Sequence, residues 1–106
     1  MSTMRGLLRN HIKHHGLFMY VPHLSYFLDL PDVIALRVPS PLMVQYDRED
    51  EIFSLEGQQQ ADEKIAQIYS RIGHPDNYAG RFYAGPHKFD IEMQDDAFEW
   101  LEKHLL

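Results

Sequence analysis

The segment PLMVQY, from Pro41 to Tyr46, decides how the rest of the chain can fold. It is a short, mostly apolar run with no alternation between apolar and polar positions. Alternating strands have one face in water, whereas a continuous apolar run is typical of a strand covered on both faces, as in a parallel sheet. The acidic cluster DREDE, residues 47–51, follows it. We therefore predict a buried strand over residues 41–46.

The residues after this strand predict a helix, a second strand and a final helix. Helical spacing extends from about Ser54 to Ile72, where Gly73 can end the helix. The aromatic segment NYAGRFYAG, residues 77–85, predicts the second strand. The last segment, EMQDDAFEWLEKHLL, predicts the final helix. In each of the two helices, one apolar stripe is predicted to face the core. The two stripes are Ala61, Ile65, Ile68, Tyr69 and Ile72, and Met93, Ala97, Trp100, Leu101 and Leu105.

The order strand, helix, strand, helix predicts an α/β fold built on a parallel β-α-β unit with a closing C-terminal helix. Residues 41–106 hold this unit. Two strands cannot complete a sheet, because each needs both faces covered and its edges paired or protected. We therefore expect one partial domain over residues 1–106, with its sheet edge covered by self-association or by a complementary segment.

Residues 1–40 are predicted to add an N-terminal helix and an aromatic, proline-rich segment. Met4, Leu8 and Ile12 recur at helical spacing, and Arg5 and Arg9 line another face. Residues 17–41 contain four prolines, which favour loops and short helical turns, one of them opened by Pro31. The stretch LFMYVPHLSYFL within it is a candidate lid because of its composition and its place before the first strand.

The composition excludes several classes of protein. A chain of 106 residues with 44% apolar and 25% charged residues has the composition of a globular domain. Residues 1–48 hold five Lys/Arg and three Asp/Glu, whereas residues 49–106 hold five and thirteen, so nucleic acid is not an expected partner. The absence of cysteine excludes disulfides, and no apolar run is long enough for a membrane span. We expect a cytoplasmic protein with no membrane partner.

Side chains capable of catalysis follow both predicted strands. The first strand runs into the acidic cluster, and the second is followed, after AGP, by His87. Ligands of open α/β sheets bind outside the carboxyl ends of the strands, where these side chains would meet. A carboxylate that orients one imidazole nitrogen leaves the other free to take a proton from a nucleophile. These residues fit the acid and base portion of a catalytic triad; the alternative is that His87 is a structural or solvent-exposed loop residue and that the acids form a solvated turn or start a helix.

At these residues the sequence resembles the C-terminal portion of an α/β-hydrolase of the esterase and dienelactone-hydrolase-like branches. PSPLMVQYDREDEIF is similar to the strand and turn that deliver the acid, FYAGPHKFD to the last strand and histidine loop, and AFEWLEKHL to the closing helix. The resemblance covers about residues 37–106 and implies Asp50 and His87 as catalytic residues. Asp47 is the alternative acid, although the family commonly has glycine near that position. A small-molecule ester is the implied substrate, and no cofactor is implied.

The family pattern is incomplete in this chain. The nucleophile of an α/β-hydrolase lies in a G-x-S-x-G elbow; none of the serines has that context, and no glycine-rich segment offers oxyanion donors. We expect both parts to lie upstream of Met1 in a complete enzyme, so that this chain alone, a truncated hydrolase, is inactive. The alternative is a non-catalytic interaction or structural module that self-associates.

The histidine-rich segment near the N-terminus offers a weaker signal. His11 and His15 are four residues apart and can face one metal ion from a helix. No H-E-x-x-H pattern and no third ligand accompany them. We therefore predict no metal site at these residues.

Overall fold

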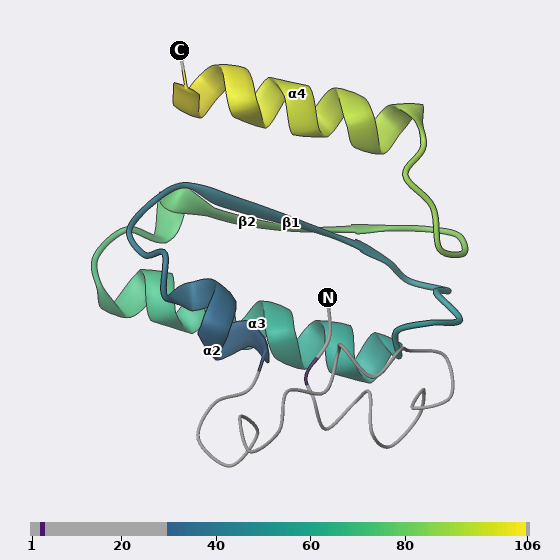
Figure 1. Ribbon diagram of the computed structural model, residues 1–106, viewed down its shortest axis with the longest axis horizontal. Helices are drawn as coiled ribbons and strands as arrows, with labels where there is room; N and C mark the ends of the chain where they lie inside the picture. Colours follow the sequence, from purple (N-terminus) through teal and green to yellow (C-terminus); the bar gives the residue numbers. More distant parts are fainter. Residues whose placement is uncertain (1–2, 4–29, 106) are drawn as a thin grey trace.

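Two parallel strands form the centre of the structure, with helices on both of their faces (Figure 1). This computed structural model describes Thr3 and residues 30–105. The elements in chain order are α2 (Leu30–Ala35), β1 (Leu42–Asp47), α3 (Leu55–Arg71), the 3-10 helix η4 (Pro75–Asn77), β2 (Tyr78–Tyr83) and α4 (Ile91–Leu105). The predicted N-terminal helix, the lid-like stretch, His11 and His15 lie outside the described residues.

The predicted parallel β-α-β unit is confirmed. Strands β1 and β2 pair in parallel from Leu42 opposite Tyr78 to Asp47 opposite Tyr83. Helix α3 connects the two strands in sequence, as the periodicity predicts. Because the strands are parallel, the loops that follow them leave the sheet at the same end, where the carboxyl ends of both strands lie. This end is called the carboxyl edge.

The ends of α3 follow from local signals in the sequence. The Oγ atom of Ser54 accepts a hydrogen bond from the backbone N–H of Gly57 at 3.2 Å, which satisfies one donor of the first turn. The helix ends before Gly73, whose φ of +82° lies in the left-handed region that glycine adopts without strain. Both boundaries agree with the sequence prediction.

The apolar core lies between the sheet and α3. Its buried members are Val44 and Tyr46 of β1 and Ile65 and Tyr69 of α3. Helix α2 packs on α3 on the same side, as Figure 1 shows, and it begins with Pro31 in its first turn, as predicted. An ion pair between Lys64 and Asp32, 2.9 Å apart, also connects these two helices.

A series of hydrogen-bonded polar side chains lies within this apolar interface. The Tyr78 hydroxyl donates to Asp62 at 2.6 Å and lies 3.2 Å from the Tyr46 hydroxyl. Burial raises the pKa of Tyr46 to about 12 and also raises the pKa of Tyr78, so both hydroxyls keep their protons at neutral pH. Gly80 of β2 leaves room for these side chains, because a Cβ atom there would overlap the Asp62 carboxylate and approach the Tyr78 hydroxyl.

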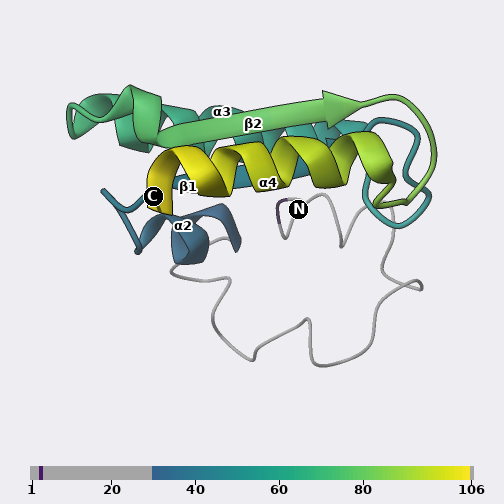
Figure 2. The same cartoon turned by 90° about the horizontal axis from the view of Figure 1, so that it is seen from above.

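Helix α4 covers the other face of the sheet and runs along the strands (Figure 2). Polar side chains attach it. The Gln45 amide donates to the Met93 carbonyl at 2.7 Å, and the Tyr83 hydroxyl donates to Asp96 at 2.6 Å. Among the residues of α4, only Met93 is fully buried. The sheet therefore has one mainly apolar interface and one with a large polar share.

The predicted core stripe of α4 is wrong in part. Met93 is buried and Ala97 and Trp100 are half-buried, whereas Leu101 and Leu105 are exposed. The apolar residues of α4 occupy a broad arc, and a two-stranded sheet covers only the part that contains Met93. No helix within the described residues has the length and apolar character needed to cross a membrane.

Candidate functional site

The loops after the two strands are fastened together at the carboxyl edge of the sheet. Beyond the last strand residues, the Arg48 N–H donates to the Tyr83 carbonyl at 2.8 Å and the Glu49 N–H to the Gly85 carbonyl at 3.1 Å. The Glu49 carboxylate accepts in return from the Gly85 N–H at 2.6 Å. The φ of Gly85, +111°, is one that other residues rarely adopt. These contacts place the acidic cluster beside the loop that carries His87.

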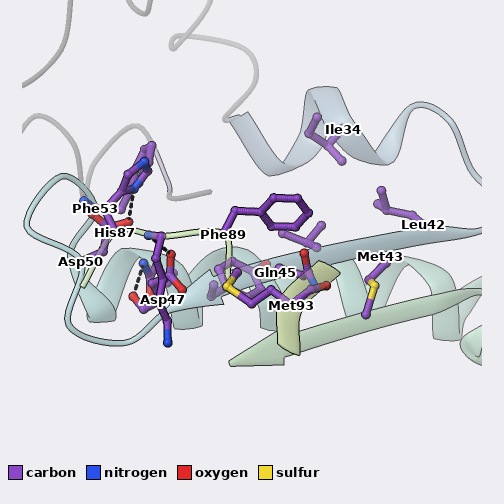
Figure 3. A pocket seen from close by; sticks show the side chains of 14 residues that line it. Ile34, Leu42, Met43, Gln45, Asp47, Asp50, Phe53, His87, Phe89 and Met93 are labelled. Carbon is purple, nitrogen blue, oxygen red and sulfur yellow. Dashed lines mark hydrogen bonds and ion pairs between the residues drawn. The ribbon is translucent and has the colours of Figure 1, made fainter. Parts of the chain in front are cut away.

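His87 and Asp50 form a direct pair at this edge. The Nδ1 atom of His87 lies 2.8 Å from Oδ2 of Asp50 (Figure 3). The other carboxylate oxygen of Asp50 accepts from the backbone N–H of Ile52 at 2.7 Å. Only 4% of the Asp50 side chain is exposed, so the carboxylate has a fixed orientation and little competing water. The sequence placed these two residues at neighbouring strand ends, and the structure brings them together.

The imidazole of His87 is half exposed, with 53% of its side chain accessible to solvent. The hydrogen bond with Asp50 raises the pKa of His87 above its ordinary value of 6.5, and the charges of Asp50 and Asp47 add to the rise. Since Nδ1 donates to Asp50 in the neutral ring, Nε2 then carries the lone pair. The ring nitrogen on the far side from Asp50 can therefore act as a base.

Asp47 lies in the same cluster but has different partners. Its Oδ2 atom accepts from the backbone N–H of Lys88 at 2.9 Å, and its backbone carbonyl accepts from the Gln58 amide at 2.9 Å. Its Oδ1 atom is buried and has no hydrogen-bond partner within the described part of the chain. Of the two carboxylates that the sequence left as alternatives, it is therefore Asp50 that hydrogen-bonds to the imidazole.

A groove extends from this pair along β1. Its volume is about 440 Å³, and every residue from Leu42 to Asp47 contributes to its lining. Figure 3 shows His87, Asp50 and Phe53 at one end and Ile34 and Leu42 at the other. Most of the lining side chains are apolar, among them Ile34, Leu42, Met43, Phe53, Phe89 and Met93. The pair thus borders a groove whose lining combines apolar side chains with polar and charged ones.

Sequence reasoning missed two features of the site. The aromatic rings of Phe53 and Phe89 line the groove beside His87, with the Phe53 ring centroid 6.4 Å from that of the imidazole. The unpartnered oxygen of Asp47 is the second feature. The phenylalanines adjoin the predicted acid and histidine in sequence, which was an available signal, whereas the hydrogen bonding of one carboxylate oxygen leaves no trace in a sequence.

Comparison with known proteins gives no match: no protein-family model, no curated protein and no solved structure is similar to the chain. The function therefore has to be inferred from the residues and their arrangement.

Proposed function

We propose that the chain is the C-terminal portion of an α/β-hydrolase and supplies the acid and the histidine of a serine esterase. The observation that carries this proposal is the 2.8 Å contact between His87 Nδ1 and a carboxylate of Asp50 that is only 4% exposed. The position of the pair at the carboxyl edge of a parallel sheet supports it. The motifs that resemble the family surround both residues.

In this proposal Asp50 orients His87 and His87 transfers the proton. The carboxylate of Asp50 accepts the Nδ1–H hydrogen bond, which leaves the lone pair of Nε2 available. Nε2 takes the proton of a serine hydroxyl as the oxygen attacks the ester carbonyl, and it then donates that proton to the departing alkoxide. Asp50 stabilises the imidazolium formed in between, consistent with the raised pKa of His87.

The nucleophile has to come from a complementary segment, either of the same polypeptide or of a separate one. Among the serines that the structure describes, Ser54 caps α3 through its hydroxyl oxygen, and neither Ser40 nor Ser70 lies in an elbow sequence. The groove along β1 offers an apolar surface beside the base, where part of the ester or the complementary segment would lie.

Hydrolysis of p-nitrophenyl acetate tests this proposal. The chain is assayed alone and mixed with the N-terminal part of an esterase that retains its nucleophile elbow but lacks its own acid and histidine. We expect no turnover by the chain alone above that of His87→Ala. In the mixture we expect turnover that requires His87 and Asp50 and is unchanged in the control Asp95→Asn, an exposed carboxylate on α4.

Two results would contradict the proposal. Turnover by the chain alone that disappears in His87→Ala would show that this chain contains its own nucleophile. Turnover in the mixture that survives His87→Ala would show that the imidazole is not the base.

A second candidate function, a self-associating module, is favoured by the outer face of α4. Four apolar side chains form an exposed stripe there: Ile91, Phe98, Leu101 and Leu105. The spacing of Ile91, Phe98 and Leu105 by seven residues suits packing against another helix.

Size-exclusion chromatography with light scattering tests this second function. We expect a dimer that Phe98→Asp converts to a folded monomer, whereas Asp95→Asn leaves it intact. A chain that remains monomeric at millimolar concentration would contradict self-association through this stripe.

A further inference from the structure

The cluster at the carboxyl edge contains more negative charge than its histidine can neutralise. Asp47 is only 6% exposed, the Asp50 side chain is only 4% exposed, and one imidazole faces them. Even a protonated His87 leaves one net negative charge in the cluster. The charge of Lys88 acts on Asp47, but the Nζ atom of this lysine pairs with Asp90 at 2.8 Å. Buried carboxylates are costly without compensating charge, so the cluster favours an additional cation.

Asp47 has a buried carboxylate oxygen that lacks a partner within the described residues, and a cation would supply one. Oδ2 of this carboxylate is held by the Lys88 N–H at 2.9 Å, which fixes the orientation of the group. Oδ1 is buried, and no donor within the described residues reaches it. Buried polar atoms in proteins nearly always have a partner, and an ion is one of the partners that can satisfy them. Asp47 thus has a carboxylate oxygen of fixed orientation that takes no part in the hydrogen bond between Asp50 and His87.

We propose that Asp47, Asp50 and His87 together bind a divalent transition-metal ion of the Zn²⁺ class. One ligand atom from each residue can be chosen so that all three lie within 4.8 Å of one another. A tetrahedral Zn²⁺ ion holds ligand atoms roughly 3.4 Å apart, so no pair has to close by more than roughly 1.4 Å on binding, and the 2.8 Å pair of His87 and Asp50 has to open slightly. The half-exposed ring of His87 is the part of the cluster that can make this movement.

The mixture of ligand types selects the kind of metal. Mg²⁺ and Ca²⁺ prefer sites made of oxygen ligands only. An imidazole beside two carboxylates suits Zn²⁺ and its neighbours in the first transition row. Three protein ligands leave a fourth position open, as in catalytic rather than structural zinc sites. That open position adjoins the groove along β1, which the same three residues line.

Metal binding does not depend on the proposed esterase function, because it needs no nucleophile and no partner. It does compete with that function. An ion bound to Nδ1 of His87 takes the lone pair of that nitrogen, so the neutral ring carries its proton on Nε2, which then cannot act as a base. The two proposals can therefore fail separately.

Calorimetric titration with ZnCl₂ tests the site. The chain is used with His11, His14 and His15 replaced by alanine, because these residues could bind the metal elsewhere. We expect a binding event that Asp47→Asn weakens at least about tenfold. The asparagine oxygen can still accept from the Lys88 N–H, so the loop should keep its shape. The matched control, Asp95→Asn on α4, should bind as the parent does.

His87→Ala provides a second variant, since this half-exposed side chain should not be needed for folding, and it should also weaken binding at least about tenfold. Circular dichroism checks that both variants are folded, and the His87 ring resonances should shift when Zn²⁺ is added to the parent. The proposal is wrong if millimolar Zn²⁺ leaves the His87 resonances unchanged, or if both folded variants bind as tightly as the parent.

Discussion

The two faces of the β1–β2 sheet are covered in different ways. On one face, Ile65 and Tyr69 of α3 pack on Val44 and Tyr46 of β1, and all four are buried. On the other face, α4 buries Met93 and is attached through hydrogen bonds from Gln45 and Tyr83. Apolar burial contributes more to folding than a hydrogen bond exchanged with water. The α3 face therefore provides most of the stability, and α4 is the more easily displaced layer.

This difference bears on function, because the loop that carries His87 leads directly into α4. The Asp50 partner comes from the loop that leads into α3, the better-packed helix. One member of the pair thus adjoins the better-packed helix and the other adjoins the more weakly packed one. The hydrogen bonds between the two loops connect these two sides of the molecule.

Substitution of Ile65 by alanine should have the largest effect, because it leaves a cavity in the α3 core. We expect a loss of about 2–5 kcal/mol in the free energy of unfolding, measured by urea denaturation. The matched change on α4, Leu101→Ala, should cost the monomeric chain less than about 0.5 kcal/mol because that side chain is already exposed. Equal losses in the two variants would contradict the expected difference in stability between the α3 and α4 faces of the sheet. They would indicate that a partner covers the α4 stripe.

Gly80→Ala should also destabilise the α3 face. The added methyl group would overlap Asp62 and disturb its hydrogen bond with Tyr78. We expect a loss of about 1–3 kcal/mol, typical of overpacking. If the overlap with Asp62 is the cause, the same substitution should cost less when Asp62 is already alanine. A full-sized loss in that background would assign the effect to the strand backbone instead.

Tyr83→Phe tests the polar attachment of α4. It removes the hydrogen bond to Asp96 and the one accepted from Gln45 while keeping the ring. We expect a loss of about 0.5–1.5 kcal/mol in the free energy of unfolding. Hydrogen exchange of the α4 amides should accelerate more than that of the α3 amides. Uniform acceleration in both helices would show that α4 does not open separately.

The sequence was sufficient for the elements whose signals are local. The apolar run of β1, the stop at Gly73 and the periodic positions of α3, apart from the exposed Ile72, predicted that half of the fold, because each signal depends on neighbouring residues only. The exposed part of α4 could not be predicted in the same way. Its apolar residues cover a broad arc, and which of them is buried depends on how much sheet lies beneath.

The candidate site shows the same limit. Parallel strands predicted that the acidic cluster and His87 meet, and this is confirmed. The choice between Asp47 and Asp50 as partner depended on which carboxylate the loop turns toward the imidazole. That orientation comes from the Ile52 N–H bound to Asp50 and the Lys88 N–H bound to Asp47. These are contacts of the folded backbone, which residue types alone do not specify.

The smallest expected effect is the contribution of the His87–Asp50 pair to the free energy of unfolding. The hydrogen bond with Asp50 raises the pKa of His87, so the protonated imidazole favours the folded state. This stabilisation is fully present below the unfolded pKa of about 6.5 and is lost as the pH rises through the higher folded pKa. It should be small because the ring is half exposed and screened by solvent.

An NMR titration of His87 measures the effect directly. The folded chain should titrate above 6.5, and Asp50→Asn should return the pKa toward that value. The difference in melting temperature between the parent and Asp50→Asn should then narrow as the pH rises above the folded pKa of His87. An unchanged titration in Asp50→Asn would show that Asp47 and the other carboxylates control the imidazole. In that case, the two loops would be connected mainly by the bonds of Glu49 with Gly85 and of Asp47 with Lys88, and the His87–Asp50 pair would contribute little to stability.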